Sequence, residues 1–246
     1  MMKRGINMGY ASGPLTFPAI CNEELESLIK KHATELVYSA KSVISAPGDS
    51  LDYIYYVKNG RTRHVIINYD GNEKVLYALS RGWFFGEASS DLELQTSLYS
   101  IAEENTIIYK ITAKKYRELV DNNKLFRDAI LRSYAQKILI LRYELEDISF
   151  NSCKNRLKRL LFAVADTSQL IDDQWYNLKV KYTQYDLGII VGGARVTINK
   201  LINELCNENS LRIINHKMQI NKIDYQKCLE LSQKISDLQC KKNSLY

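Results

Sequence analysis

The side chains best suited to chemistry lie in one stretch, between residues 182 and 205. Its second half carries a polar face that can reach base edges or phosphates in a DNA groove. The members of this face are Arg195, Thr197, Asn199, Lys200 and Asn203. Apolar residues repeat every 3.6 positions on the other side, as in an amphipathic helix. No Ser/His/Asp set, paired carboxylates or phosphate-loop fingerprint stands out, so the sequence indicates recognition and we expect no enzyme.

Two short helices joined by a tight turn are predicted to position this face. Thr183 and Asp186 have the spacing of a capping box at a helix start. Gly192-Gly193 supplies the turn, where a left-handed backbone favours glycine, and Gly188 is expected to face the second helix. This spacing is typical of a helix-turn-helix, whose second helix enters the major groove. Taken alone, the pattern also fits an ordinary helical hairpin with a solvated face.

Charge is distributed unevenly along the 246 residues, which carry a formal net charge of +6. Residues 1–151 contain 19 basic and 19 acidic side chains, whereas residues 152–222 contain 11 basic and 6 acidic ones. The positive excess therefore coincides with the predicted helix-turn-helix, as contact with phosphates requires. There is no transmembrane run and no secretion signal, so we expect a cytoplasmic protein. Its five scattered cysteines and three isolated histidines predict no metal site.

Upstream of this region, residues 35–111 show short β-rich runs separated by glycine turns, which predict an antiparallel β-barrel or jelly roll. Asn59-Gly60 and Asp70-Gly71 are expected to form hairpin turns. Asn22 is expected to cap a short helix before the barrel, and residues 1–20 to form a flexible arm.

A long helix is predicted from about Lys124 to Ser149. Apolar residues spaced alternately by three and four form a seam suited to a dimer helix. The seam consists of Ile130/Leu131, Tyr134, Ile138, Leu141, Leu145 and Ile148. A core helix packed on its own barrel is the alternative, and both can hold. Asn151-Ser152 is predicted to be a hinge, and residues 211–222 a wing hairpin.

The predicted fold class is therefore α+β, with three parts. Residues 1–123 are expected to form an effector-binding β-barrel domain, residues 124–150 a dimerisation helix, and residues 151–246 a winged helix-turn-helix domain.

Two segments resemble the CRP/FNR family of transcription regulators. TQYDLGIIVGGARVTINKLINEL is similar to the DNA-binding motif of that family, and Gly82–Glu87 matches the G-x-F-F-G-E signature of its cyclic-nucleotide-binding-type barrel. The resemblance implies a homodimer that presents two recognition helices to palindromic DNA and contacts RNA polymerase. The implied DNA-binding residues are Thr183, Arg195, Val196, Thr197, Asn199 and Lys200.

Individual roles follow from side-chain chemistry. Arg195 is expected to bond a guanine or a phosphate, while Val196 and Thr197 contact thymine methyls. Lys200 stands where most members of the family have Arg, so we expect it to anchor a phosphate.

The effector is expected to differ from that of cyclic AMP receptors. The stretch Gln95-Thr96-Ser97 lacks the Arg that neutralises the cyclic phosphate there, and only Cys21 lies near the N-terminus, so neither cyclic AMP nor an iron–sulfur cluster is expected. Haem is not expected either. Aromatic residues with one cation suit a flat anion such as a phenolate. The expected effector-binding residues are Tyr77, Trp83, Gly86, Glu87, Tyr99, Tyr134 and Lys137.

The segments DGNEKVLYAL, SYAQK and ARVTINK resemble the halorespiration branch of the family, which responds to chlorinated phenols. The Gly-Glu at Gly86-Glu87 differs from the Gly-Lys of that branch, and Lys137 has a second reading as a solvated charge on a helix flank. We therefore expect an effector-gated activator. A regulator that responds to another anion or to redox state is one alternative, and a sensor without DNA-binding activity is the other.

Overall fold

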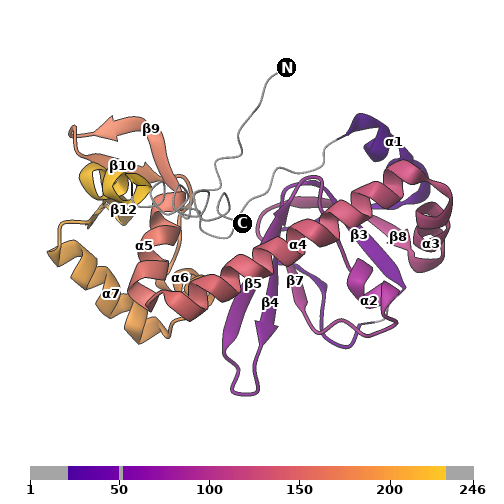
Figure 1. Ribbon diagram of the computed structural model, residues 1–246, viewed down its shortest axis with the longest axis horizontal. Helices are drawn as coiled ribbons and strands as arrows, with labels where there is room; N and C mark the ends of the chain where they lie inside the picture. The colour runs from indigo at the N-terminus through magenta and orange to yellow at the C-terminus, as the bar shows by residue number, and fades with distance from the viewer. Residues whose placement is uncertain (1–21, 50–51, 231–246) are drawn as a thin grey trace, which may run out of the picture. The chain divides into compact units, whose positions relative to one another are not determined.

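The computed structural model describes residues 22–49 and 52–230. The chain divides into two compact units, the first ending at Leu145 and the second beginning at Glu146. The division falls inside the long helix α4, Lys124–Phe150 (Figure 1). Each unit is described by itself.

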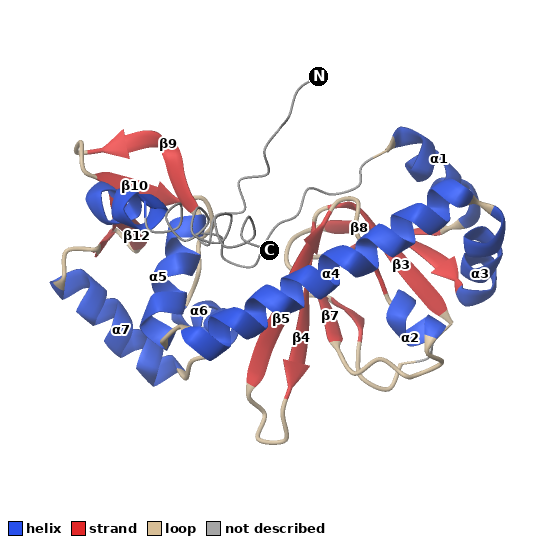
Figure 2. Ribbon diagram, in the orientation of Figure 1, coloured by secondary structure: helices blue, strands red, loops and turns tan. Residues whose placement is uncertain are grey.

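The first unit is built on two four-stranded antiparallel sheets, with strand orders β1-β8-β3-β6 and β2-β7-β4-β5 (Figure 2). This double-sheet architecture confirms the predicted antiparallel barrel or jelly roll. The strands are β1 Thr34–Tyr38, β2 Val43–Ser45, β3 Tyr53–Asn59, β4 Arg61–Ile67, β5 Glu73–Ser80, β6 Phe84–Phe85, β7 Tyr99–Ala102 and β8 Thr106–Thr112.

Helices accompany these sheets. They are α1 Glu23–His32, α2 Glu87–Asp91, α3 Ala113–Asn122 and α4. The Asn22 side chain accepts a hydrogen bond from Glu24 N at 2.8 Å, which confirms the predicted cap of α1. The short helix α2 was not predicted, because five residues are too few to show a helical period.

One apolar core joins helices α1, α3 and the start of α4 to strands β3, β6 and β8. Phe126, Ala129 and Ile130 are the buried residues that α4 contributes to it. Full burial of a side chain such as Phe or Ile stabilises the fold by roughly 1.5–3 kcal/mol. This packing fixes α4 along the barrel, so side chains further along the helix are held against the strands.

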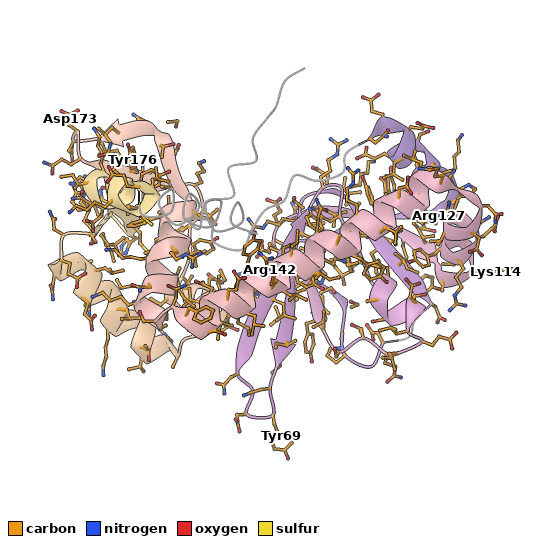
Figure 3. The ribbon with its side chains drawn as sticks, viewed as in Figure 1. Tyr69, Lys114, Arg127, Arg142, Asp173 and Tyr176 are labelled. Atoms are coloured by element: carbon orange, nitrogen blue, oxygen red, sulfur yellow. The ribbon has the colours of Figure 1, made fainter. Side chains whose placement is uncertain are left out.

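Of the two predicted hairpin turns, the one at Asp70-Gly71 is confirmed and the one at Asn59-Gly60 is wrong. Asp70-Gly71 lies in the connection between β4 and β5, which pair antiparallel, and Tyr69 stands fully exposed at its tip (Figure 3). The Asn59-Gly60 hairpin is wrong, because β3 and β4 belong to different sheets. Gly60, with φ of 87°, turns a corner between the sheets, and a Cβ there would lie 2.6 Å from Thr106 Oγ1.

The second unit contains a four-stranded sheet of order β11-β12-β10-β9, with helices before, between and after its strands. Its elements are α5 Cys153–Ala163, β9 Ala165–Ile171, β10 Trp175–Leu178, α6 Gln184–Val191, α7 Arg195–Asn207, β11 Leu211–Ile214 and β12 Lys217–Asn221. The β11–β12 pair confirms the predicted wing hairpin, with Asn215 and His216 in the left-handed region at φ of 49° and 60°. Apolar residues of α5, α6 and α7 pack with β11 and β12 into a separate core.

A last helix begins at residue 222 and reaches the limit of the described residues at 230. Asn221 caps this helix, since its side chain accepts from Ile223 N at 2.9 Å. Asp224, in the first turn, contacts Lys158 and Ser210. The predicted N-terminal arm lies outside the described residues.

Candidate functional site

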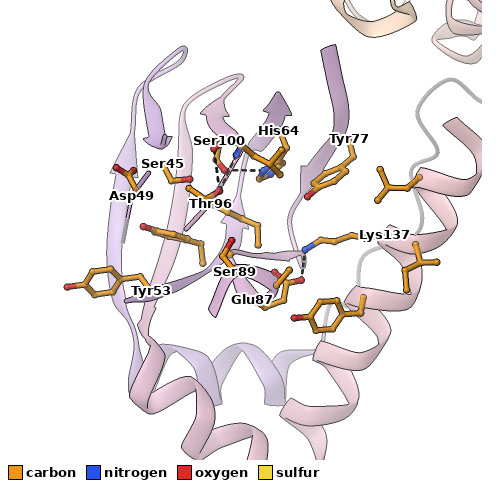
Figure 4. A pocket seen from close by; sticks show the side chains of 18 residues that line it. Ser45, Asp49, Tyr53, His64, Tyr77, Glu87, Ser89, Thr96, Ser100 and Lys137 are labelled. Carbon is orange, nitrogen blue, oxygen red and sulfur yellow. Dashed lines mark hydrogen bonds and ion pairs between the residues drawn. The ribbon is translucent and has the colours of Figure 1, made fainter. Parts of the chain in front are cut away.

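A cavity of about 220 Å³ opens in the first unit between the barrel strands and α4 (Figure 4). Five of the seven residues expected to bind an effector line it: Tyr77, Gly86, Glu87, Tyr134 and Lys137. They come from β5, the start of α2 and the middle of α4. Far-separated segments therefore meet in one place of a size suited to a small molecule.

Gly86 brings the first polar group into the cavity. It caps α2 with φ of 87°, and a Cβ there would lie 3.1 Å from Tyr53 O, so the turn favours glycine on both counts. Glu87 follows as the first residue of α2, and its side chain is only 1 % exposed. A left-handed turn thus delivers a carboxylate into the interior of the barrel.

Lys137 of α4 meets this carboxylate. The Lys137 ammonium forms an ion pair with Glu87 Oε1 (Figure 4). Ser133 Oγ donates to the same oxygen at 3.3 Å. Lys137 is 9 % exposed, so its alternative reading as a solvated surface charge is wrong. Two buried charges tolerate removal from water only when they are paired and hydrogen-bonded, as these are. The ammonium expected to meet an effector is already neutralised by Glu87.

Tyrosine hydroxyls surround this ion pair. The hydroxyls of Tyr134 and Tyr116 donate to Asp91 Oδ2 at 2.7 and 2.9 Å. Burial, followed by the hydrogen bond to Asp91, raises the pKa of both hydroxyls. Burial and the nearby Glu87 raise the pKa of Tyr77, whose ring centroid lies 6.0 Å from Lys137 Nζ. All three hydroxyls therefore stay protonated at neutral pH.

His64, which no sequence motif marked as a site residue, also lines the cavity. His64 is 1 % exposed and contacts the rings of Tyr77 and Phe85. Its Nε2 lies 3.1 Å from Thr62 Oγ1 and its Nδ1 lies 3.1 Å from Ser100 Oγ. Burial, and secondarily the charge of Lys137, lowers the pKa of His64 to about 3. The imidazole is therefore neutral.

The hydrogen bonds assign its tautomer. Thr62 Oγ1 donates to Leu79 O at 3.4 Å, so it accepts from His64 Nε2–H. His64 Nδ1 then accepts from the hydroxyl of Ser100. The lone pairs of Ser100 remain to accept a hydrogen bond from a ligand, because its proton is committed to His64.

Two of the expected effector residues do not line the cavity. Tyr99 lies on β7, where side chains alternate, and the alternation turns Ser100 inward and Tyr99 to the opposite face. Trp83 is buried in the turn before β6, and Phe85 at the end of β6 lines the cavity instead. The exact register of strands β4 and β7 would have identified His64 and Ser100 as lining residues, but the sequence does not define that register.

The charge of the lining bears on the ligand. Asp49, Glu87 and Lys137 are the charged residues among the described lining side chains, and none of the lining residues is an arginine. Thr96 lines the cavity from the stretch where an arginine would neutralise a cyclic phosphate. A phosphate would therefore compete with Glu87 for the ammonium of Lys137.

The second candidate site is the helix-turn-helix formed by α6 and α7. Asp186 N donates to Thr183 Oγ1 at 3.1 Å and Thr183 N donates to Asp186 Oδ2 at 2.9 Å, which confirms the predicted capping box. Gly192 has φ of 71°, as the predicted turn requires. A Cβ at Gly188 would lie 2.8 Å from Gly193 O, and one at Gly193 would lie 2.7 Å from Cys153 Sγ. That Cβ at Gly188 would also lie 3.8 Å from Ile198 Cγ1 of α7, so Gly188 faces the second helix as predicted and lies closest to the turn.

Arg156 of α5 holds the end of α6, a role that the sequence did not reveal. Its Nε donates to Val191 O at 2.8 Å, and its Nη1 donates to Asn151 O at 2.8 Å. Cations near a helix C-terminus satisfy carbonyls that have no partner within the helix. Arg156 therefore links the α6–α7 turn to the start of α5.

One face of α7 is open to solvent. We call it the α7 face, and it consists of Arg195, Val196, Thr197, Asn199, Lys200 and Asn203, all exposed. Val196, the apolar member of this face, is 69 % exposed. Asn199 Oδ1 accepts from Gln184 Nε2 at 3.2 Å. Within the described part of the chain, neither Arg195 nor Lys200 has an ion-pair partner.

Two features are absent from the described residues. No helix in these ranges is long and apolar enough to cross a membrane. Likewise, no cluster of three or more His, Cys, Asp or Glu side chains that could hold a metal ion occurs in the part of the chain that the structure describes.

Comparisons with known proteins agree with this architecture. Residues 35–123 match the family model of the cyclic nucleotide-binding domain. The cAMP-activated global transcriptional regulator CRP of Pasteurella multocida is 25% identical over 169 residues, which are 68% of this chain and 80% of that protein. The similarity to cAMP-activated Vfr of Pseudomonas aeruginosa is 24% over 180 residues, covering 71% and 83%.

Solved structures show the same fold. The c-di-GMP responsive global regulator CLP of Xanthomonas campestris has a TM-score of 0.73 at 16% identity, covering 81% of this chain and 99% of that one. CprK complexed with OCPA has a TM-score of 0.63 at 19% identity, covering 85% and 96%. At these identities the structural likeness establishes the fold.

Residues 35–123 therefore form a cyclic nucleotide-binding domain, and over about two thirds of its length the chain is similar to transcriptional regulators of the CRP type.

Proposed function

We propose that the protein is an effector-gated, sequence-specific DNA-binding transcription regulator, and an activator. The observation that carries the proposal is the α7 face, where two unpaired cations and several polar side chains are exposed on the second helix of a helix-turn-helix. In such motifs this helix enters the major groove, and exposed Arg and Lys side chains meet guanine edges and phosphates. The regulator names of its relatives support the same class of function.

The active form in this proposal is a homodimer formed through α4. Most of its seam residues remain exposed, with Leu131 at 60 %, Ile138 at 64 % and Leu145 at 66 %, whereas Ile130 is buried in the core. An apolar stripe of this length on a solvent-facing helix suits a second copy of the same helix. A two-fold dimer then offers two recognition helices to a palindromic operator, and RNA polymerase is the further partner.

The effector in this proposal is a small aromatic anion of the phenolic class. The rings of Tyr77, Phe85 and Tyr134 line the cavity, and Lys137 supplies the cation. Ile138 and Leu141, which belong to the seam, also line the cavity. A partner helix on the seam would therefore cover residues that contact the effector, and this links effector binding to dimer geometry.

Gating follows as a population shift. An effector that touches both the barrel and α4 stabilises the arrangement in which it makes the most contacts. Because α4 carries both the cavity residues and the seam, that arrangement also sets the spacing of the two recognition helices.

The test is fluorescence-anisotropy binding to a palindromic operator library, with and without a panel of halogenated phenols and hydroxyphenylacetates. We expect tight, salt-dependent binding in the presence of one class of these compounds. Equal DNA binding with and without every compound contradicts the phenolic effector. Absence of DNA binding under all conditions contradicts the regulator, and a Lys137→Ala variant that keeps its effector response contradicts the cavity assignment.

A further inference from the structure

The cation in the cavity already has an ion-pair partner within the protein. Lys137 and Glu87 form a buried ion pair, with Glu87 on α2 and Lys137 on α4 (Figure 4). Ser133 Oγ adds a hydrogen bond to the same carboxylate oxygen, 3.3 Å away. An anionic ligand that reaches Lys137 must therefore take the ammonium away from a carboxylate that cannot follow it into water.

We infer that Glu87 is an internal counter-ion of the cavity, and that an anionic effector binds to Lys137 together with one proton, which Glu87 takes up. This inference rests on the proposed function, because it concerns the same cavity and the same class of ligand.

The reason is the cost of an unpaired buried charge. Glu87 is 1 % exposed, so without Lys137 its carboxylate would be left in the interior with only the Ser133 hydroxyl. A buried carboxylate that loses its cation becomes neutral by binding a proton, because desolvation disfavours the charged form. Once protonated, Glu87 keeps a polar partner in Ser133 and no longer attracts Lys137.

The net charge of the occupied cavity is the same whether the phenol is neutral or ionised in solution. A phenol that is neutral in solution gives its hydroxyl proton to Glu87 and binds as the phenolate on Lys137, so no proton is exchanged with water. A phenol that is ionised in solution binds as the phenolate while Glu87 takes one proton from water. In both cases the bound phenolate and the proton on Glu87 together add no net charge to the cavity.

The other titratable groups around Glu87 cannot replace it as the proton acceptor. His64, on β4, is neutral, but its Nδ1 already accepts from Ser100 and burial lowers its pKa to about 3. Tyr77, Tyr116 and Tyr134 face Glu87 from β5, α3 and α4 with protonated hydroxyls.

Two further carboxylates lie near the cavity. Asp91 accepts hydrogen bonds from two tyrosine hydroxyls and lies in an exposed position, so its partners do not include Lys137. Asp49, in the lining, is exposed and accepts from Ala46 N at 2.7 Å. Glu87 alone is both buried and dependent on the cation that the ligand takes.

The experiment is isothermal titration calorimetry on the full chain with halogenated phenols that run from largely neutral to fully ionised at the working pH. Each titration is repeated in buffers with different ionisation enthalpies, which gives the number of protons taken up. We expect close to one proton for the fully ionised phenols and none for the neutral ones. The affinity for an ionised phenol should fall about tenfold for each pH unit above the pKa of that phenol.

The variant Glu87→Gln removes the proton acceptor and leaves Lys137 without its counter-ion. Ionised phenols should then bind with no proton uptake, and their affinity should stop falling as the pH rises. The matched control is Glu144→Gln on α4, which removes a carboxylate that pairs with Lys74 at 2.9 Å outside the cavity lining. This control should keep the wild-type proton uptake and pH profile.

Each outcome decides between the two proposals. Binding of ionised phenols to the unmodified protein without proton uptake overturns the counter-ion inference and leaves the phenolic effector standing. This measurement does not depend on whether the Glu87→Gln chain folds. If none of the phenols binds to either the unmodified chain or a folded Glu87→Gln chain, the effector class itself is wrong, and the inference falls with it.

Discussion

The charged side chains of the two candidate sites differ in whether they have partners within the protein. In the cavity, the buried side chains of Glu87, Lys137 and His64 have partners within the protein. Glu87 pairs with Lys137, and His64 bonds both Thr62 and Ser100. On the α7 face, Arg195 and Lys200 extend into solvent with no ion-pair partner among the described residues. The first region resembles a protein interior with a small space in it, and the second resembles a surface prepared for a partner of opposite charge.

This difference determines what a ligand must displace when it binds to each region. A ligand of the cavity must exchange with an existing partner, so its affinity depends on protons and on shape. A ligand of the α7 face adds to groups that only water and counter-ions occupy, so its affinity depends on salt. The two regions should therefore respond to different solution conditions, and four changes can test the comparison.

The largest effect is expected from Lys137→Ala. It leaves Glu87 buried without a cation, and breaking a buried pair in this way costs about 3–5 kcal/mol of stability. Urea denaturation, followed through the unfolding transition of the first unit, measures this loss of stability. The double variant Lys137→Ala/Glu87→Gln should recover much of the loss, because no charge is left unpaired. A single variant as stable as the parent would mean that water reaches this site.

Acidification comes next, through His64. Its pKa falls from 6.5 to about 3 on folding, so between these values the unfolded state binds a proton that the folded state does not. Stability is fully present above pH 6.5 and declines as the pH falls, with a slope of up to about 1.4 kcal/mol per pH unit. Denaturation at a series of pH values measures this slope. His64→Gln should reduce it, and an unchanged slope would show that other groups cause the pH dependence.

The α7 face is tested by Arg195→Ala beside Lys200→Ala. Loss of Arg195 should cost on the order of 1–3 kcal/mol of DNA binding and relax preference at one base pair. Loss of Lys200 should weaken all sequences alike and lower the salt slope by about one. Anisotropy titrations over a range of salt concentrations separate the two. A change of sequence preference in the Lys200 variant would contradict its role as a phosphate anchor.

The smallest effect is expected from the helix caps. Thr183→Ala removes the hydrogen bond that Thr183 Oγ1 accepts from Asp186 N in the capping box of α6 and should cost about 1 kcal/mol of stability in the second unit. Asn22→Ala removes the cap of α1 and should cost a similar amount in the first unit. Thermal unfolding of both variants measures the effects. A Thr183 variant with unchanged stability but weaker DNA binding would assign this hydroxyl to the DNA contact.

Features with a local cause were predictable from the sequence. The caps at Asn22 and Thr183, the α6–α7 turn and the wing all depend on neighbours within a few residues, and the structure has them as predicted. Asn59-Gly60 was misjudged because the same dipeptide can close a hairpin or turn a corner, and the choice depends on distant strands.

The cavity was predictable only in part, for the same reason. Lys137 could be placed near the barrel from the helical period, but its pairing with Glu87 joins residues 50 positions apart. The exchange of Tyr99 for Ser100 is a shift of one position on a strand, and this reverses the side chain that faces inward. Register and long-range pairing arise from packing of the whole barrel, so no local pattern contains them.

The hydrogen-bonded chain from Ser100 through His64 and Thr62 to Leu79 O also makes the cavity observable in solution. A buried Nε2–H that is held by a threonine hydroxyl exchanges slowly with water, so it should give its own proton resonance well downfield of the amide region. Any ligand that enters the cavity passes close to this imidazole and should shift the resonance. His64 therefore offers a spectroscopic report on occupancy that needs neither DNA nor a label.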